Sequence, residues 1–348
     1  MHFAFTDQQL EFRDAVRQVL AKECTTDAVR AAYDAPEARS PRWATLADLG
    51  VCGLTVPEGR GGFGLGLVDL VPLVEEAGRV ALPEPLATTT GIAGPLLADL
   101  EGDGTDGRVG SWLAGLASGG VTVGVADAAR PGAPVAGADG ADVLLLVTDG
   151  PDGRELHGLD APDLTVVPVS SLDPTRRLGT PEWQPSSDTL LLGGSGVDTV
   201  LTRTADRAAV VTGAELLGLA EAMVSQTADY AKDRQQFGKP IGSFQAVKHL
   251  VAGAQVLLEF ARPVVYGAAW ALDNGSPDAS RAASVAKAYA SEAALEAARV
   301  SLQVHGAIGY TWECDLHLFL KRTWALAEAW GSAGDHRARL LDLLLADG

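Results

Sequence analysis

Cysteine and positive charge are both scarce in this sequence. Its 348 residues include three cysteines, Cys24, Cys52 and Cys314, which lie far apart and form no CxxC pair. This spacing argues against a disulfide scaffold or a zinc ribbon and fits a reducing compartment. The 27 lysine and arginine residues stand against 45 aspartate and glutamate residues, which gives a net charge of −18. Without a local basic patch, nucleic acids and anionic membrane surfaces are poor partners.

Long apolar runs are missing as well. No uninterrupted apolar stretch approaches ~18 residues, the length that a membrane-spanning helix needs. The best stretch, 256–272, contains Glu259 and Arg262. Charged residues also interrupt the N-terminal segment, where a signal peptide would have an apolar core. We therefore expect a cytoplasmic protein without membrane insertion. The hydrophobic fraction of 47% and the charged fraction of 21% are typical of a folded globular chain.

The chain divides into three parts by its sequence pattern. Residues 1–103 show helical periodicity, with Thr6 as the expected N-cap of a helix over 6–22. Residues 104–205 contain short β-rich runs between clusters of Gly, Pro, Asp and Ser, which predicts an antiparallel barrel or sandwich. Residues 206–348 contain long periodic segments joined by short breaks, which predicts a four-helix bundle. The expected fold class is α+β.

A glycine-rich segment at 59–64, GRGGFG, matches the GxGxxG pattern of dinucleotide-binding turns. Such a turn needs a preceding strand that begins a βαβ unit, so that a pyrophosphate meets a helix N-terminus. Here Pro57 and Glu58 separate the glycines from the apolar run before them, and no alternation of strands and helices follows. The sequence therefore favours a surface turn over a Rossmann site.

Two segments at the ends of predicted helices contain residues suited to a phosphorylated ligand. In DRQQFGKPIGSFQ, Arg234 closes a helix before a turn. Its guanidinium either caps that helix or binds phosphate oxygens bidentately, with Phe237 beside it as an apolar face. In QVHGAIGYT, Gly306 and Gly309 either expose the backbone to a ligand or simply end a helix. The residues alone leave both alternatives open.

With these motifs in this order, the chain resembles the acyl-CoA dehydrogenase family over most of its length. FTDQQLEFRDAVRQVLAKE resembles the family's opening helix, and WATLADLGVCGLTVPEGRGGFGLGLVDLVPLVEEAGR resembles its next conserved stretch. DRQQFGKPIGSFQAVKH and QVHGAIGYTWECDLHLFLKR resemble its two C-terminal signatures. The resemblance implies an α-helical first domain, a β-barrel middle domain and a four-helix bundle. It also implies FAD as cofactor and α,β-dehydrogenation of an acyl-CoA thioester as the reaction.

The resemblance assigns cofactor roles by position. In this family the arginine of the RxxFG motif contacts the FAD pyrophosphate, and the signature that matches QVHGAIG here contacts the adenosine half. The implied cofactor contacts are Arg234, Phe237, Gln245, Gln303 and the backbone at Gly306 and Ala307. In the family these groups reach an FAD that a neighbouring subunit mainly binds. The resemblance therefore implies an intersubunit site, and no metal.

The glutamate that acts as base in this family is missing from both of its usual positions. A carboxylate is needed to remove the α-proton of the substrate. The position after the last bundle helix holds Trp330, and the second family position, at the start of the first bundle helix, falls on Ala208. Glu328 and Glu215 are the nearest displaced carboxylates, although solvated glutamates are common in this acidic chain. The sequence therefore assigns no catalytic residue.

The middle segment also departs from the family. VTVGVADAARPGAPVAGADGADVLLLV retains neither the A-x-T-E-P stretch nor the tryptophan-containing strand that hold the flavin ring and the thioester. This pattern resembles the smaller, non-catalytic chain of heteromeric α2β2 acyl-CoA dehydrogenases of actinobacterial sterol side-chain degradation. Two alternatives stay open: a self-sufficient homo-oligomer with a displaced carboxylate base, and a flavin-free structural subunit. The steroid suggestion rests on analogy rather than on a named residue.

Overall fold

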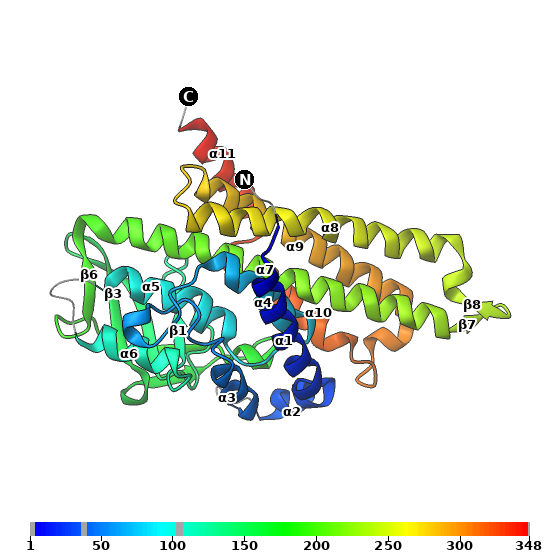
Figure 1. Cartoon of the computed structure of the whole chain (residues 1–348), viewed down its shortest axis with the longest axis horizontal. Coiled ribbons are helices and arrows are strands. Elements are labelled where there is room, and N and C mark those ends of the chain that lie inside the picture. Colours follow the sequence, from blue (N-terminus) through cyan, green and yellow to red (C-terminus); the bar gives the residue numbers. More distant parts are fainter. Residues whose placement is uncertain (1–3, 36–39, 102–106, 347–348) are drawn as a thin grey trace.

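The computed structural model describes residues 4–35, 40–101 and 107–346. Helices form the first third of the chain (Figure 1). They are α1 (Asp7–Glu23), α2 (Thr26–Asp34), α3 (Pro41–Asp48), α4 (Leu67–Arg79), the π-helix η2 (Ala87–Ala93), α5 (Gly94–Leu100) and α6 (Gly107–Ala117). Thr6 caps α1 as expected, because its hydroxyl accepts a hydrogen bond from the Gln9 amide at 3.2 Å. The GxGxxG segment forms a short 3₁₀ turn, η1 (Glu58–Arg60), and no Rossmann unit.

The middle segment is a small open sheet rather than a barrel. Its strands are β1 (Val123–Val125), β2 (Val143–Gly150), β3 (Gly153–Asp160), β4 (Thr165–Pro168), β5 (Gly179–Glu182) and β6 (Leu190–Gly193). The main sheet has the order β1-β2-β3-β6, and β4 pairs separately with β5. β1 runs parallel to β2, so the expectation of a purely antiparallel structure was wrong at this edge. Strand direction depends on the path of the 126–142 connection, which residue alternation does not report.

The boundaries of the middle segment also differ from the expectation. It opens with the helix α6, which buries Val109, Trp112, Leu113 and Leu116. This spacing is helical, but the segment's many glycines and its position among β-rich runs obscured it. At the other end, the first bundle helix begins at Val197, before the expected boundary at 206.

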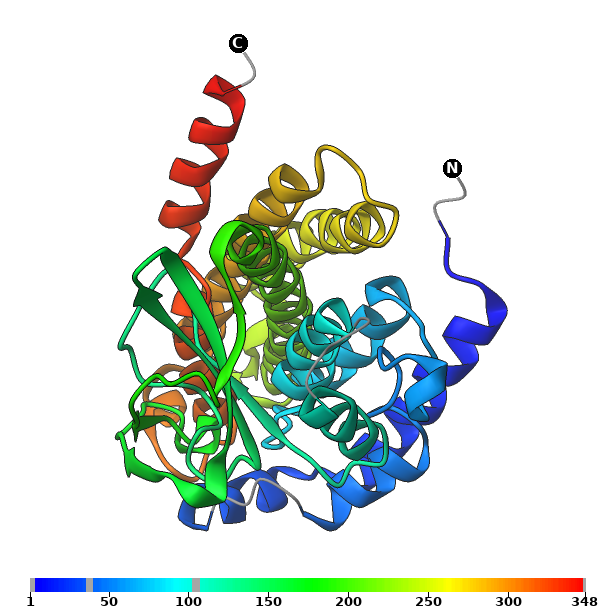
Figure 2. The same ribbon diagram turned by 90° about the vertical axis from the view of Figure 1, so that its left-hand side faces the viewer.

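The C-terminal bundle matches the expectation closely. It consists of α7 (Val197–Asp233), α8 (Gln245–Asp273), α9 (Ala279–His305) and α10 (Leu316–Glu328), followed by α11 (Ala333–Leu345). A short hairpin of β7 (Gln235–Gln236) and β8 (Lys239–Pro240) connects α7 to α8 and lies at the end of the bundle opposite the sheet (Figure 1). The α11 helix projects away from the body of the molecule (Figure 2). The α+β fold class is therefore confirmed.

The central helix of the bundle is unusually apolar. The segment Gly194–Asp233 is long and apolar enough to cross a membrane by length and composition, yet 89% of its most apolar window is buried inside this fold. Its residues pack against α4, α8, α9 and α10. The apolar character of α7 is thus explained by its place at the centre of the protein core.

Helices α4 and α7 cross with their backbones in contact, and glycines make this possible. A Cβ atom at Gly218 of α7 would lie 1.9 Å from the Glu75 carbonyl oxygen and 2.6 Å from the Arg79 amide nitrogen. A Cβ atom at Gly78 of α4 would lie 2.1 Å from the Glu215 carbonyl oxygen. Atoms do not approach this closely, so only glycine fits at either position.

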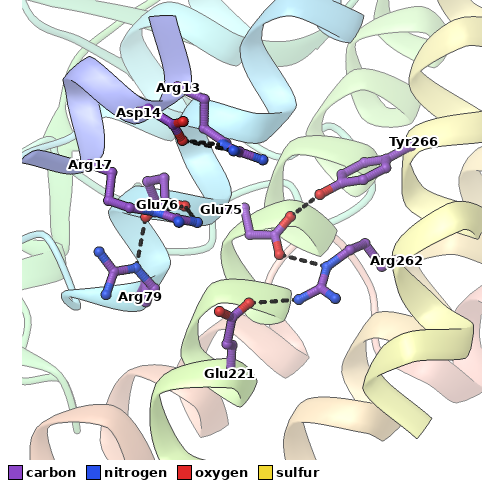
Figure 3. Close-up of polar contacts among 9 residues, drawn as sticks. All are labelled: Arg13, Asp14, Arg17, Glu75, Glu76, Arg79, Glu221, Arg262 and Tyr266. Carbon is purple, nitrogen blue, oxygen red and sulfur yellow. Dashed lines mark hydrogen bonds and ion pairs between the residues drawn. The ribbon is translucent and has the colours of Figure 1, made fainter. Parts of the chain in front are cut away.

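Two groups of ion pairs, which share helix α4, lie near this crossing and together join four helices (Figure 3). Their members are Arg17 of α1, Glu75, Glu76 and Arg79 of α4, Glu221 of α7, and Arg262 and Tyr266 of α8. The Arg262 guanidinium donates to Glu75 at 2.9 Å and to Glu221 at 2.6 Å, and the Tyr266 hydroxyl donates to the other oxygen of Glu75. Burial raises the pKa of Glu75 even with Arg262 beside it. Both Glu75 oxygens have donors, so this carboxylate holds helices α4 and α8 together.

Candidate functional site

The residues with implied cofactor roles meet at the hairpin end of the bundle. Arg234 is the C-cap of α7, and Phe237 lies at the tip of the hairpin. The ends of α7 and α9 are side by side, because the Tyr230 ring stacks on His305 with a centroid distance of 4.3 Å. This contact places Gln303 and the Gly306–Ala307 backbone next to the end of α7. Gln245 begins α8 just after the hairpin.

These groups are exposed and available to a ligand. Among the residues that the structure describes, no acidic side chain pairs with Arg234, which is exposed. The Phe237 side chain is 92% exposed, and its backbone has a left-handed φ of 54°. Gly306 has a φ of 64°, and no atom lies within 4 Å of where its Cβ would be. A free guanidinium, an exposed aromatic ring and an uncovered backbone fit a cofactor with a diphosphate and a flat base.

A second location of interest lies where the resemblance places the family's base. Trp330, just after α10, lines a small, partly open cavity of about 70 Å³ between the loop at 82–88, the sheet and the bundle. Ligand pockets in proteins usually have about 300–1,000 Å³. The cavity is therefore too small for a flavin ring together with an acyl thioester, and this side of the chain does not fit the cofactor.

A buried charge cluster occupies one wall of this cavity. The Arg322 guanidinium of α10 donates to Glu215 at 2.7 Å, to Asp173 at 3.2 Å and to Thr175 at 3.0 Å. Burial acts to lower the pKa of Arg322, but the carboxylates of Glu215 and Asp173 outweigh it and raise this pKa. Arg322 therefore stays protonated, and its bonds cross-link α7, α10 and the 3₁₀ turn after β4.

The displaced carboxylates do not provide a free base in this cavity. Glu328 is the last residue of α10, is exposed and lies outside the lining of the cavity. Glu215 does line it, but its carboxylate is paired with Arg322. Glu84, the other lining carboxylate, accepts from Arg42 and Ser40 through Oε1, each at 2.6 Å, while its buried Oε2 has no hydrogen-bond partner among the described residues. Ala208, at the second family position, is fully buried.

The turn that carries Trp330 is held by two buried titratable side chains. The Lys287 ammonium of α9 donates to Ser291 at 3.1 Å and to the carbonyl oxygens of Ala327 at 3.0 Å and Gly331 at 2.9 Å, so all three of its donors are used. His336 of α11 lies 2.9 Å from the Trp330 carbonyl oxygen. Desolvation lowers the pKa of Lys287 to about 7.

Replacing Lys287 by methionine is expected to change how stability depends on pH. The folded-state pKa of about 7 lies below the value of about 10.4 in an unfolded chain. Between these values the unfolded chain binds the proton and the folded chain does not, so the wild type gains stability as pH rises, by up to about 1.4 kcal/mol per pH unit. Urea unfolding of both proteins from pH 6 to 9 measures this difference.

The matched control for this prediction is Lys248→Met, which removes an exposed lysine near the start of α8. Its stability is expected to follow that of the wild type across the same pH range. If the stability difference between the wild type and Lys287→Met stays constant with pH, the ammonium is not the buried titrating group.

Arg322 and Lys287 were not among the residues predicted from the sequence. Lys287 occupies a core position of α9, because its neighbours at helical spacing, Ala283, Ala290 and Ser291, are also buried. A lysine at an apolar position of an alanine-rich helix is the signal that could have identified it. Arg322 lies at a similar core position of the leucine-rich α10 helix.

Comparison with known proteins identifies the family. Residues 6–120 match the model of the acyl-CoA dehydrogenase N-terminal domain, and residues 194–342 match that of the acyl-CoA dehydrogenase C-terminal domain. Over 327 residues the chain is 36% identical to acyl-CoA dehydrogenase IpdE2 of Mycobacterium tuberculosis (strain ATCC 25618 / H37Rv), which covers 92% of each chain. The chain belongs to the acyl-CoA dehydrogenase family. Members of this family are oxidoreductases that generally bind FAD.

A second sequence relative and two solved structures also match most of the chain. The IpdE2 protein of Mycolicibacterium smegmatis (strain ATCC 700084 / mc(2)155) is 34% identical over 94% of this chain and 96% of its own. A variant of the Tcur3481-Tcur3483 steroid ACAD superimposes with a TM-score of 0.84 at 29% identity, with 98% of both chains covered. The ChsE4-ChsE5 complex from Mycobacterium tuberculosis gives a TM-score of 0.87 at 22% identity over 99% of both chains. These comparisons show that the chain has the acyl-CoA dehydrogenase fold.

Proposed function

We propose that this acyl-CoA dehydrogenase chain is the non-catalytic subunit of a heteromeric enzyme. The observation that carries the proposal is the cavity at the family's base position, which measures about 70 Å³ and has Trp330 in its wall. The charge cluster of Arg322 and Glu215 occupies this location, so neither a flavin ring nor a thioester fits there. The partner subunit would supply the glutamate base, the flavin-ring pocket and the substrate cleft.

The hairpin end of the bundle is this chain's contribution to the partner's site. Arg234 would bind the pyrophosphate of FAD, Phe237 would cover the cofactor, and Gln303 would bind its adenosine half. Gln245 and the backbone at Gly306 and Ala307 complete this surface. Bound FAD supplies the hydride acceptor for α,β-dehydrogenation, and this chain's residues hold the cofactor in place.

An exposed apolar face on α8 supports a subunit interface. Val256, Leu257 and Phe260 are 51%, 44% and 66% exposed, although each is a large apolar residue. Clustered apolar side chains of this kind mark surfaces that another chain covers. The Tcur3481-Tcur3483 steroid ACAD, which carries two protein names, supports a two-chain enzyme and a steroid-derived acyl-CoA as substrate class.

The flavin content of the purified chain tests the proposal. Purified alone, the chain is expected to contain less than about a tenth of one FAD per protomer, because it offers only one side of the site. Co-expression with a catalytic acyl-CoA dehydrogenase partner chain is expected to yield about one FAD per pair of chains. The visible spectrum and the protein concentration give both ratios.

Two other outcomes of the flavin measurement would each support one of the alternatives. Near-stoichiometric FAD in the chain alone would mean a self-sufficient homo-oligomer and would overturn the proposal. A complex that forms without any flavin would instead mean a structural subunit. Glu328 lies outside the cavity and Glu215 is paired with Arg322, so neither of these two carboxylates supports the first alternative.

A further inference from the structure

Trp330 lies between two hollows of the protein. On one side it lines the small cavity of about 70 Å³, which also contains the Arg322–Glu215 ion pair in its wall. On the other side it lines a surface pocket of about 440 Å³ between the loop at 127–130, the start of α7 and α11. Tryptophan has the largest side chain of the standard amino acids, and here it lines both hollows.

The conformation of Trp330 is held against its local preference. Its φ of 56° lies in the left-handed region, which a bulky residue adopts only under strain. Buried groups on two helices hold the turn: His336 of α11 contacts the Trp330 carbonyl oxygen at 2.9 Å, and Lys287 of α9 donates to the next carbonyl at 2.9 Å. A surface turn without a role would not need this much buried polar support.

We infer that Trp330 is a plug between this chain's small cavity and the surface pocket. Its side chain fills the space through which an apolar acyl or aromatic ligand would extend from one hollow into the other. Removing the indole joins the two hollows into one pocket large enough for a small ligand. The consequence for the enzyme rests on the proposed function: in each pair of chains, the plug leaves only the partner's site open to substrate.

Binding of indole to Trp330→Ala in the full-length chain tests the inference. Indole has the shape of the group removed, so it is expected to fill the new space and raise the melting temperature by about 2 °C at tenfold excess over its Kd. The wild type is expected to show no change. A folded Trp330→Ala protein whose melting temperature does not respond to indole would overturn the inference.

The matched control is Trp312→Ala, which removes a tryptophan that is 64% exposed on the surface and borders neither hollow. An equal response in this control would also overturn the inference, because indole would then bind without a cavity. If Trp330→Ala does not fold, Trp330→Leu with benzene as probe gives the same two outcomes. The readout is the stability of this chain alone, whereas the proposed function fails on flavin content, so the two failures are distinguishable.

Discussion

Replacing Arg234 by alanine is expected to weaken FAD binding by the heteromeric enzyme about 10- to 100-fold. A hydrogen bond to a charged group contributes about 1.5–3 kcal/mol, which corresponds to this range of affinity. The guanidinium is exposed at the C-cap of α7 and has no acidic partner among the described residues, so its loss leaves no buried charge unpaired. Fluorescence titration of the deflavinated complex with FAD measures the change, and the melting temperature of the variant is expected to stay the same.

The control for this experiment is on the same helix. Arg203 is an exposed arginine near the start of α7 that pairs with Asp99 at 3.3 Å. Arg203→Ala removes the same charge at the opposite end of the helix, far from the proposed cofactor surface, and is expected to change FAD affinity less than about twofold. Its effect on folding stability is also expected to be small, because an exposed ion pair contributes little to stability. Equal FAD affinities of the Arg234→Ala and wild-type complexes would contradict the proposed intersubunit site.

Replacing Gly218 by alanine is expected to destabilise the fold by about 3 kcal/mol or more. The added methyl group would lie 1.9 Å from the Glu75 carbonyl oxygen, so α4 and α7 must move apart. Their separation would also lengthen the Arg262 bonds to Glu75 and Glu221 that lie near the crossing (Figure 3). Urea unfolding followed by circular dichroism measures the free energy of unfolding.

Gly213 offers a matched control on the same helix. A Cβ atom there would lie 3.5 Å from the nearest side-chain atoms, of Ala290 and Val265, which is ordinary contact. Gly213→Ala is therefore expected to stabilise α7 by up to about 1 kcal/mol, because alanine has the higher helix propensity. A similar effect of both substitutions would show that the crossing is not tight at Gly218.

The sequence predicted the helices better than the sheet. The expected helix over 279–305 coincides with α9, because alanine-rich periodicity and the flanking glycines depend only on local residues. The parallel pairing of β1 and β2 was not predictable in this way, because it depends on how a long loop crosses the sheet. The helix α6 was missed because its apolar period lies within a glycine-rich segment.

Part of the candidate site could be predicted from the sequence and part could not. Arg234 at a helix end and Trp330 at the base position both follow from motifs that are continuous in the sequence. The small cavity does not follow from the sequence, because its wall forms only where Arg322 contacts Asp173 and Glu215 from distant parts of the chain. Sequence reasoning could show that a base was missing, but only the folded chain shows what fills the space.

The contact between α4 and α7 also affects the position of the hairpin end, where Arg234 lies. At about 1.5 Å per residue, the 37-residue α7 is about 55 Å long, and Arg234 lies about 24 Å along its axis from Gly218. The contact at the two glycines therefore helps to fix the direction of the helix axis. A tilt of about 5° at this contact would displace Arg234 by about 2 Å, most of the length of a hydrogen bond. A change in packing between α4 and α7 would thus shift the proposed cofactor surface at the hairpin end.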